Sequence, residues 1–310
     1  MSFDRRSAAM AAAIVASVGV WLSAQPPQVF QFFVSARDAG GAPVTDLGPE
    51  DILMSENGVR QQIAKVEPLA IPVKLTIAVD NGLDSGDVLA HYRSGLKGLV
   101  EALPPDVEIT LITTAPQPRT VVRPTTDRTQ ILRGVNGFAP EQSRPRFSDA
   151  LVEYSERLQR EARDRNAVPY LPVLVMLSTA GIETRSYQPE DIEKAVAFLV
   201  KRRAKVNAIV VSTRPGDITT SAGLDLTMQS IVAIPTAKAT NGRYEGLAVS
   251  NRLPTLLPEW GRDLATLHAR QIKQFRVTVE RSRGGDLQNP RIEIARPGLS
   301  GTVTVDGYLP

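Results

Sequence analysis

The chain has 310 residues, of which 42% are hydrophobic and 22% charged, and its formal net charge is only +3. This composition is typical of a globular protein with room for one large domain or two modest ones. The sequence has no basic stripe interleaved with aromatic residues, which argues against nucleic acid as a partner. The absence of cysteine excludes disulfides, a lipid-modified cysteine and a cysteine nucleophile.

The N-terminal residues have the pattern of an export signal. Arg5 and Arg6 precede an apolar run over residues 8–22, and Leu22-Ser23-Ala24 offers small residues for cleavage. The run of about fifteen residues is shorter than the roughly 20 that span a bilayer. We therefore expect residues 1–24 to be a signal peptide and the protein to be periplasmic or secreted, with no membrane span after signal removal. A signal anchor that stays uncleaved is the alternative.

Both ends of the chain show short strand-like runs separated by turn signals. Asn57-Gly58 stands between two such runs and predicts a hairpin, because both central residues of that turn need positive φ. Three runs between residues 275 and 305 alternate polar and apolar side chains. Segments 28–70 and 271–310 are each too short for a sizeable core, so we expect them to pack together as one small all-β unit.

The middle of the chain, residues 71–270, alternates strands with helices. Apolar runs at 75–79, 171–177 and 206–212 predict buried parallel strands. The predicted fold class is therefore α/β, with a mainly parallel, doubly wound sheet flanked by the β unit. Further strands are expected at 107–112 and 120–123, a turn at 238–244, and helices at 87–103, 126–135, 149–165, 189–203, 224–234 and from near Pro258 to 272.

A loop with three carboxylates follows the strand at 75–79. Asp80, Asp84 and Asp87 precede an expected helix, and carboxylate oxygens suit a hard cation such as Mg²⁺. In open α/β sheets, ligands bind beyond the carboxyl ends of the strands. The other interpretation is a solvated loop in which Asp84 or Ser85 caps the next helix.

Several segments together resemble one family. The strand ending at Asp80 and the apolar strand ending in Ser178-Thr179-Ala180-Gly181 are similar to the central strands of a von Willebrand factor type A (VWFA) domain. The flanking motifs resemble those of exported VWFA-related proteins of acidobacteria, over nearly the whole mature chain. These motifs are Val44-Thr45-Asp46-Leu47, Asp51-Ile52, Glu56-Asn57-Gly58, Gln62-Ile63 and Ile294-Ala295-Arg296-Pro297-Gly298. The resemblance implies a Rossmann-like fold and a role in protein binding or cell adhesion.

The resemblance also implies a metal-ion-dependent adhesion site, whose motif is degenerate in this chain. In the family, the first loop reads Asp-x-Ser-x-Ser, a second loop supplies a Thr and a third an Asp. Asp80 matches the first Asp, but Gly82 and Asp84 stand at the two Ser positions. Pro145 stands at the Thr position and Ala180 at the last Asp. We therefore expect no cofactor, with Mg²⁺ at a weak site of Asp80 and Asp84 as the alternative.

Three functions are compatible with these residues. The preferred one is a non-enzymatic module that docks an unknown protein partner at the loops after strands 75–79 and 171–177. A structural component of the cell envelope, docking through the β unit, is the alternative. An enzyme such as a hydrolase is disfavoured, because only His91 and His268 could act as a histidine base and neither neighbours a Gly-x-Ser-x-Gly motif. The expected contact residues are Arg144, Arg146, Arg185 and Tyr187.

Overall fold

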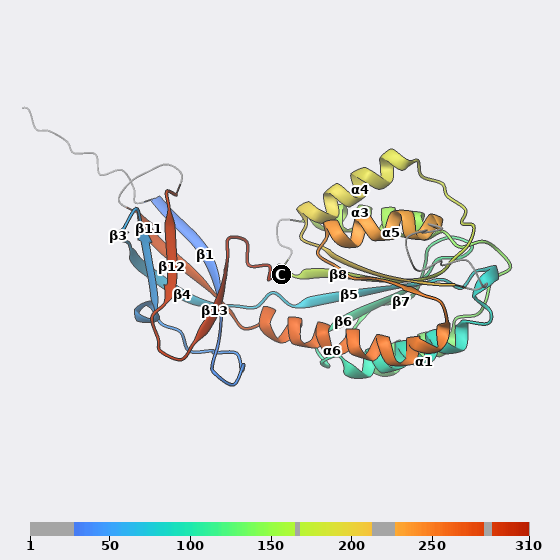
Figure 1. Ribbon diagram of the computed structural model, residues 1–310, viewed down its shortest axis with the longest axis horizontal. Helices are drawn as coiled ribbons and strands as arrows, with labels where there is room; N and C mark the ends of the chain where they lie inside the picture. Colours follow the sequence, from blue (N-terminus) through green and yellow to red (C-terminus); the bar gives the residue numbers. More distant parts are fainter. Residues whose placement is uncertain (1–27, 165–167, 213–226, 282–286, 310) are drawn as a thin grey trace, which may run out of the picture.

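The computed structural model describes residues 28–164, 168–212, 227–281 and 287–309, so the expected signal peptide over 1–24 lies outside the described residues. The described chain forms an α/β domain and a separate β unit (Figure 1). In these ranges, no helix has the length and apolar character needed to cross a membrane.

A six-stranded sheet forms the centre of the α/β domain. Its strand order is β10-β9-β8-β5-β6-β7, and every neighbouring pair is parallel except β6 with β7. With β5 counted as the first strand, this is the order 3-2-1-4-5-6 of doubly wound sheets. The predicted mainly parallel, doubly wound sheet is confirmed. Its strands are β5 (Val73–Val79), β6 (Glu108–Thr113), β7 (Arg119–Thr125), β8 (Leu171–Thr179), β9 (Lys205–Val211) and β10 (Tyr244–Leu247).

Helices cover both faces of this sheet (Figure 1). In β5, Leu75 and Ile77 pack into the core under one set of helices, whereas Ala78 belongs to the core under the other set. Because both faces are buried, the central strands are mostly apolar, and every residue of β8 is buried. One face carries α1 (Leu89–Ala102), α2 (Arg128–Gly137) and α6 (Leu253–Gln271), and the other α3 (Phe147–Glu161), α4 (Pro189–Lys201) and α5 (Met228–Ala239).

The helix expected to begin near Pro258 begins instead at Leu253. That prediction was wrong because Pro254 occupies the first turn, where proline is favoured, and Pro258 lies inside the helix. The ring of Pro258 rests against α1 at Gly98, where an added Cβ would come within 2.5 Å of Pro258 Cγ. A larger residue than glycine at position 98 would therefore collide with the proline ring.

Other boundaries also differ from the prediction. Residues 244–247 form the short edge strand β10, where the sequence indicated only the end of a turn. A strand of four residues that pairs on one side carries little local signal. Helix α3 spans Phe147–Glu161 rather than 149–165, and α5 continues to Ala239. The expected first residues of α5, 224–226, lie outside the described residues.

The β unit is a two-sheet sandwich built from both ends of the chain, as predicted. Phe32 and Val34 from the N-terminal side and Val277 from the C-terminal side are fully buried in its core. The Asn57-Gly58 hairpin is confirmed, with φ of 49° and 80°. One sheet contains β13 (Ser300–Thr304), β1 (Gln28–Arg37), β11 (Gln274–Arg281) and β4 (Gln62–Leu69), and the other β12 (Pro290–Ile294), β2 (Ile52–Glu56) and β3 (Val59–Arg60).

Two arginines of the C-terminal segment hold carboxylates of the N-terminal segment. Arg296 donates from Nε and Nη2 to the two oxygens of Asp51, at 2.9 and 2.6 Å. Arg281 donates to both oxygens of Glu56, at 3.1 and 2.6 Å. These hydrogen bonds lower the pKa of Asp51 and of Glu56. Three residues of the flanking motifs (Asp51, Glu56 and Arg296) thus serve to join the two ends of the chain.

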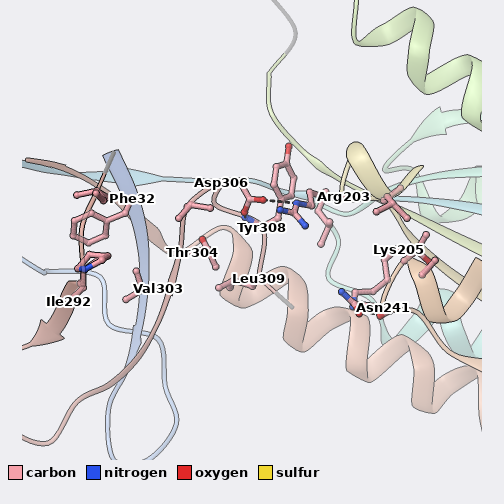
Figure 2. Close-up of a pocket in the computed structure, with 18 of the residues that line it drawn as sticks. Phe32, Arg203, Lys205, Asn241, Ile292, Val303, Thr304, Asp306, Tyr308 and Leu309 are labelled. Atoms are coloured by element: carbon pink, nitrogen blue, oxygen red, sulfur yellow. Dashed lines mark hydrogen bonds and ion pairs between the residues drawn. The ribbon is translucent and has the colours of Figure 1, made fainter. Parts of the chain in front are cut away.

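The β unit and the α/β domain meet where the chain crosses between them. The N–H of Ile71 donates to the carbonyl of Gln271 at 3.0 Å, so the two crossings lie side by side. Asp306 forms an ion pair with Arg203 at 2.6 Å. A cavity of about 450 Å³ lies at this junction, between sandwich residues such as Val303 and α/β residues such as Lys205 (Figure 2).

Candidate functional site

The candidate site lies at the carboxyl edge of the sheet, between β5 and β8. These strands are neighbours, and the strand order reverses between them. A crevice at such a reversal is where doubly wound folds bind ligands. Asp80 follows β5 directly, and Thr179 ends β8. The structure therefore brings together the two loops that the sequence singled out.

The carboxylate of Asp80 is fully buried and surrounded by donors of the protein itself. Its Oδ1 accepts from the N–H of Gly82 at 2.7 Å. Its Oδ2 accepts from the N–H and the hydroxyl of Thr179, at 3.0 and 2.5 Å, and from the Ser178 hydroxyl at 3.5 Å. Burial raises the pKa of Asp80, and these hydrogen bonds oppose the rise. The carboxylate is thus used to join the ends of two strands.

The space beside Asp80 is filled by the loop that precedes α3. A Cβ on Gly82 would lie 2.8 Å from the carbonyl oxygen of Ser143 and 2.9 Å from Pro145. The same carbonyl accepts from the N–H of Leu83 at 2.8 Å, which holds the two loops together. Backbone and a proline ring therefore occupy the place where a serine side chain would stand.

These residues do not fit the Mg²⁺ ion that the resemblance implies. Mg²⁺ needs near-octahedral oxygen ligands, and both oxygens of Asp80 already accept hydrogen bonds from the protein. Asp84 is half-buried and near enough for its charge to raise the pKa of Asp80 further. Over the described ranges, no three His, Asp or Glu side chains are grouped as a metal site would require. Ser85, an expected cap, donates from Oγ to the carbonyl of Gly82 instead.

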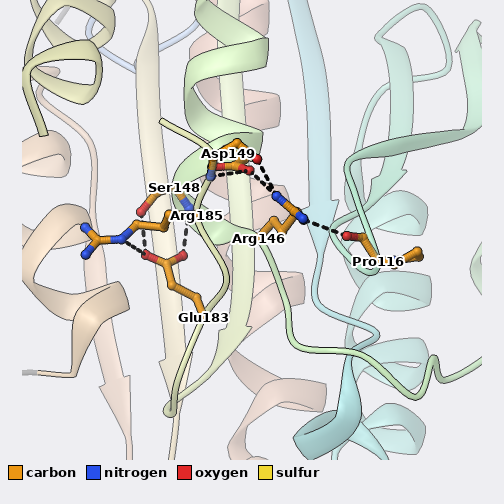
Figure 3. A network of polar contacts seen from close by, with 7 residues as sticks. Pro116, Arg146, Ser148, Asp149, Glu183 and Arg185 are labelled. Atoms are coloured by element: carbon orange, nitrogen blue, oxygen red, sulfur yellow. Dashed lines mark hydrogen bonds and ion pairs between the residues drawn. The ribbon is translucent and has the colours of Figure 1, made fainter. Parts of the chain in front are cut away.

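Two buried carboxylates attach the loop after β8 to the start of α3 (Figure 3). Asp149 accepts from the N–H of Ser186 at 2.9 Å and from Arg146 at 2.9 Å. Glu183 accepts from the N–H and the hydroxyl of Ser148, at 2.9 and 2.6 Å. Burial raises the pKa of Glu183. The loop at 181–188 is therefore held in one position on the helix N-terminus, where N–H groups favour negative charge.

The four expected contact residues divide into two pairs. Arg144 is exposed, and Arg185 is exposed with its Nε 3.7 Å from Glu183. Arg146 is half-buried and donates to the carbonyl of Pro116 at 2.7 Å as well as to Asp149. Tyr187 is half-buried against the core beneath α3 and α4, and burial raises its pKa. Arg144 and Arg185 are thus the pair that faces outward.

We expect Arg146→Gln to lower the free energy of unfolding by about 1–3 kcal/mol, because it leaves the buried Asp149 and the Pro116 carbonyl short of donors. Arg144→Gln, two positions away and exposed, should change it by less than about 0.5 kcal/mol. Urea denaturation of both variants measures the difference. Equal stabilities would show that the network around Arg146 adds nothing to the fold.

Exposed apolar residues at the same edge were missed by sequence reasoning. Leu83 is 54% and Ile182 60% exposed. The two loops that carry them are close together: a Cβ added at Gly181 would lie only 3.3 Å from Asp84 Oδ2. Each follows a buried strand by a few residues, and a single apolar residue in a polar loop is the signal that could have indicated them. Each of these two loops thus exposes one aliphatic side chain at this edge.

The two histidines lie in different settings. His91 Nδ1 is 2.8 Å from the hydroxyl of Ser250. Within the described part of the chain, no Asp or Glu is hydrogen-bonded to His91 to orient it as a base. His268 is buried at the opposite edge of the sheet, where Nδ1 accepts from the N–H of Val73 at 3.2 Å and Nε2 is 3.0 Å from Asp106. That arrangement joins α6 to the sheet.

No protein-family model and no curated protein matches this chain. Solved structures resemble it, and von Willebrand factor type A domains are among them. A von Willebrand factor type A protein from Catenulispora acidiphila is 10% identical and has a TM-score of 0.49, covering 90% of this chain and 72% of that one. The conserved hypothetical protein BatB from Bacteroides thetaiotaomicron is 14% identical with a TM-score of 0.44, covering 62% and 98%. The SpRpn10 VWA domain is 10% identical with a TM-score of 0.42, covering 59% and 94%. The strand order of the sheet, rather than these distant likenesses, defines the fold.

Proposed function

We propose that the protein is a non-enzymatic interaction module that docks a protein partner at the loops following β5 and β8, without a metal. The observation that carries this proposal is that protein groups fill the crevice while apolar side chains are exposed beside it. Asp80 is saturated by protein donors and Gly82 is covered by the loop at 143–145, while Leu83 and Ile182 are exposed at the same edge. Protein–protein interfaces commonly have an apolar centre surrounded by a polar rim.

Charged residues at the rim complete the proposed surface. Arg144 and Arg185 lie in the loops before α3 and after β8, and both are exposed. Arginine at the rim of an interface contributes to orientation and to the rate of association with an acidic partner. An apolar centre of Leu83 and Ile182 with arginines around it favours a partner that has an apolar patch bordered by carboxylates.

The test is affinity capture of partners from envelope and secreted fractions, with the full chain as bait. The double variant Leu83→Asp/Ile182→Asp should lose at least about thirtyfold in affinity, the effect of removing a hot spot of 2 kcal/mol or more. Val29→Asp/Val59→Asp is the matched control, because these valines are 59% and 64% exposed on the β unit. Each capture is run with Mg²⁺ and with a chelator.

The outcomes separate the proposed function from its alternatives. Binding that survives the chelator and is lost only in the Leu83/Ile182 variant supports the proposal. Loss of binding in chelator alone would favour the Mg²⁺-dependent site of Asp80 and Asp84. Loss in the Val29/Val59 variant alone would favour a structural envelope component that docks through the β unit. The envelope and secreted fractions are chosen because the pattern of residues 1–24 predicts a periplasmic or secreted location.

A further inference from the structure

A second cavity, of about 220 Å³, lies at the opposite edge of the sheet from the docking loops. It is formed where β9 begins, at the turn that precedes β10, and along one side of α6. Trp260, Leu264 and Leu267 of α6 provide its apolar wall. Lys205 and Asn241, which Figure 2 shows beside the cavity at the junction, line both cavities.

The lining of this cavity carries an excess of positive charge. Lys205, Arg243 and Arg270 line it, whereas Asp263 is the one carboxylate among the described lining residues. Asp263 is already paired with Arg243, at 2.5 Å, and the Arg243 guanidinium stacks over the Trp260 ring, 5.2 Å from its centre. Two cations, Lys205 and Arg270, are therefore left without a carboxylate in this part of the structure.

Neither of these two cations has its charge balanced. The Lys205 ammonium donates to the backbone carbonyl of Asn241 at 2.6 Å, which supplies a dipole but no negative charge. In the described part of the chain the Arg270 side chain has no ion pair and its buried Nε has no hydrogen-bond acceptor, and the charge of Arg37 repels it. Burial lowers the pKa of Lys205 and of Arg270. Partly buried cations of this kind are stabilised by an anion that reaches them.

Two buried N–H donors at the same cavity also have no acceptor. The indole Nε1 of Trp260, on a side chain only 2% exposed, and the Nε of Arg270 are both buried without a hydrogen-bond partner among the described residues. Buried polar groups in proteins are satisfied by the protein, by water or by a ligand, so two residues of the cavity lining still have a hydrogen bond to donate. An anion that accepts hydrogen bonds would satisfy both the cations and the open donors.

The size and the wall of the cavity limit what this acceptor can be attached to. At about 220 Å³ the cavity is smaller than the roughly 300–1,000 Å³ pockets of drug-sized ligands. Its wall of Trp260, Leu264 and Leu267 favours an aromatic or branched apolar body. We propose that this cavity binds a small apolar carboxylic acid, with its carboxylate on Lys205 and Arg270 and its apolar body against Trp260.

The test uses phenylacetate and the full chain carrying Trp21→Phe, which leaves Trp260 as its only tryptophan. Phenylacetate titrated into the millimolar range should move the indole N–H signal of Trp260 in a nitrogen–proton NMR spectrum, in a saturable manner. Phenylacetamide, which has the same shape without the charge, and acetate, which lacks the ring, should leave the signal in place.

Substitutions in the cavity lining test which side chains bind the carboxylate. Arg270→Gln and Lys205→Met should each raise the dissociation constant for phenylacetate about tenfold or more, the effect of losing a hydrogen bond to a charged group. Arg262→Gln is the matched control, because Arg262 is exposed on the same helix and does not line the cavity.

Several results would overturn the proposal. They are an indole signal that phenylacetate does not move, an equal effect of phenylacetamide or acetate, and equal affinities of the Arg270→Gln and Arg262→Gln variants. If a substitution prevents folding, the comparison of the three ligands on the chain that carries only Trp21→Phe still tests the proposal.

Discussion

Asp80→Ala should lower the free energy of unfolding by about 3–5 kcal/mol, because it leaves buried donors without an acceptor. The N–H groups of Gly82 and Thr179 and the Thr179 hydroxyl all donate to this carboxylate. A vacant metal ligand would behave in the opposite way, since removing an uncompensated buried charge stabilises a protein or leaves it unchanged. Urea denaturation in the presence of a chelator measures the effect.

Asp84→Ala is the control for this substitution. Asp84 lies in the same loop, is half-buried, and lies close enough to repel Asp80. Its removal should change the free energy of unfolding by no more than about 0.5 kcal/mol, as for most surface substitutions. An Asp80→Ala protein as stable as the Asp84→Ala protein would mean that the buried carboxylate is held for a ligand and not for the fold.

The pH dependence of the Asp80 effect has a definite sign. Burial raises the pKa of Asp80 in the folded state above its ordinary 3.8. The folded protein therefore binds this proton more tightly than the unfolded chain does. The resulting stability is fully present below pH 3.8 and is lost as the pH rises through the folded-state pKa. The stability gap between the unsubstituted protein and Asp80→Ala should consequently narrow between acidic and neutral pH.

Gly82→Ser, which restores the first serine of the adhesion motif, should destabilise the protein by about 1–3 kcal/mol or more without creating Mg²⁺ affinity. A Cβ at this position would come within 2.8 Å of the Ser143 carbonyl and 2.9 Å of Pro145. Both contacts are to backbone or a rigid ring, so the loop before α3 would have to move. Thermal unfolding gives the stability, and calorimetric titration with Mg²⁺ gives the affinity.

Gly86→Ser provides a matched control for this second substitution. Gly86 lies in the same loop, is exposed, and has no atom within 4 Å of an added Cβ. It should therefore change the unfolding temperature very little. If Gly82→Ser were as stable as Gly86→Ser and released heat with millimolar Mg²⁺, the loop at 143–145 would be adaptable and the Mg²⁺ alternative would gain support.

Elements defined by local pattern could be predicted from the sequence. The buried strand β5 is mainly apolar, β8 is an unbroken apolar run over residues 171–177, and Asn57-Gly58 fixes a hairpin through its positive φ angles. The pairing of the two chain ends could also be predicted, because neither end is long enough to bury a core alone. The start of α6 was misplaced because Pro254 and Pro258 are equally good first-turn residues in the sequence, and only packing against Gly98 distinguishes them.

The candidate site was predicted in place but not in detail. Asp80 and Thr179 end neighbouring strands, so their proximity followed from the expected topology. That Glu183 would accept from Ser148, and Asp149 from Ser186, could not be predicted, since these contacts depend on how the loop after β8 folds over the start of α3. The exposure of Leu83 and Ile182 is likewise a property of the assembled loops. Arg146 looked like a surface cation, although its guanidinium is used inside the network.

The interleaving of the two chain ends in the β unit has a consequence for the order in which the protein assembles. All six strands of the α/β sheet lie between residues 73 and 247, so this domain can form before synthesis ends. The β unit cannot, because β1 and β4 both pair with β11, which begins at Gln274. The small unit therefore closes last. A chain that stops before Gln274 would keep the docking loops but leave two unpaired strands, which other chains can recognise.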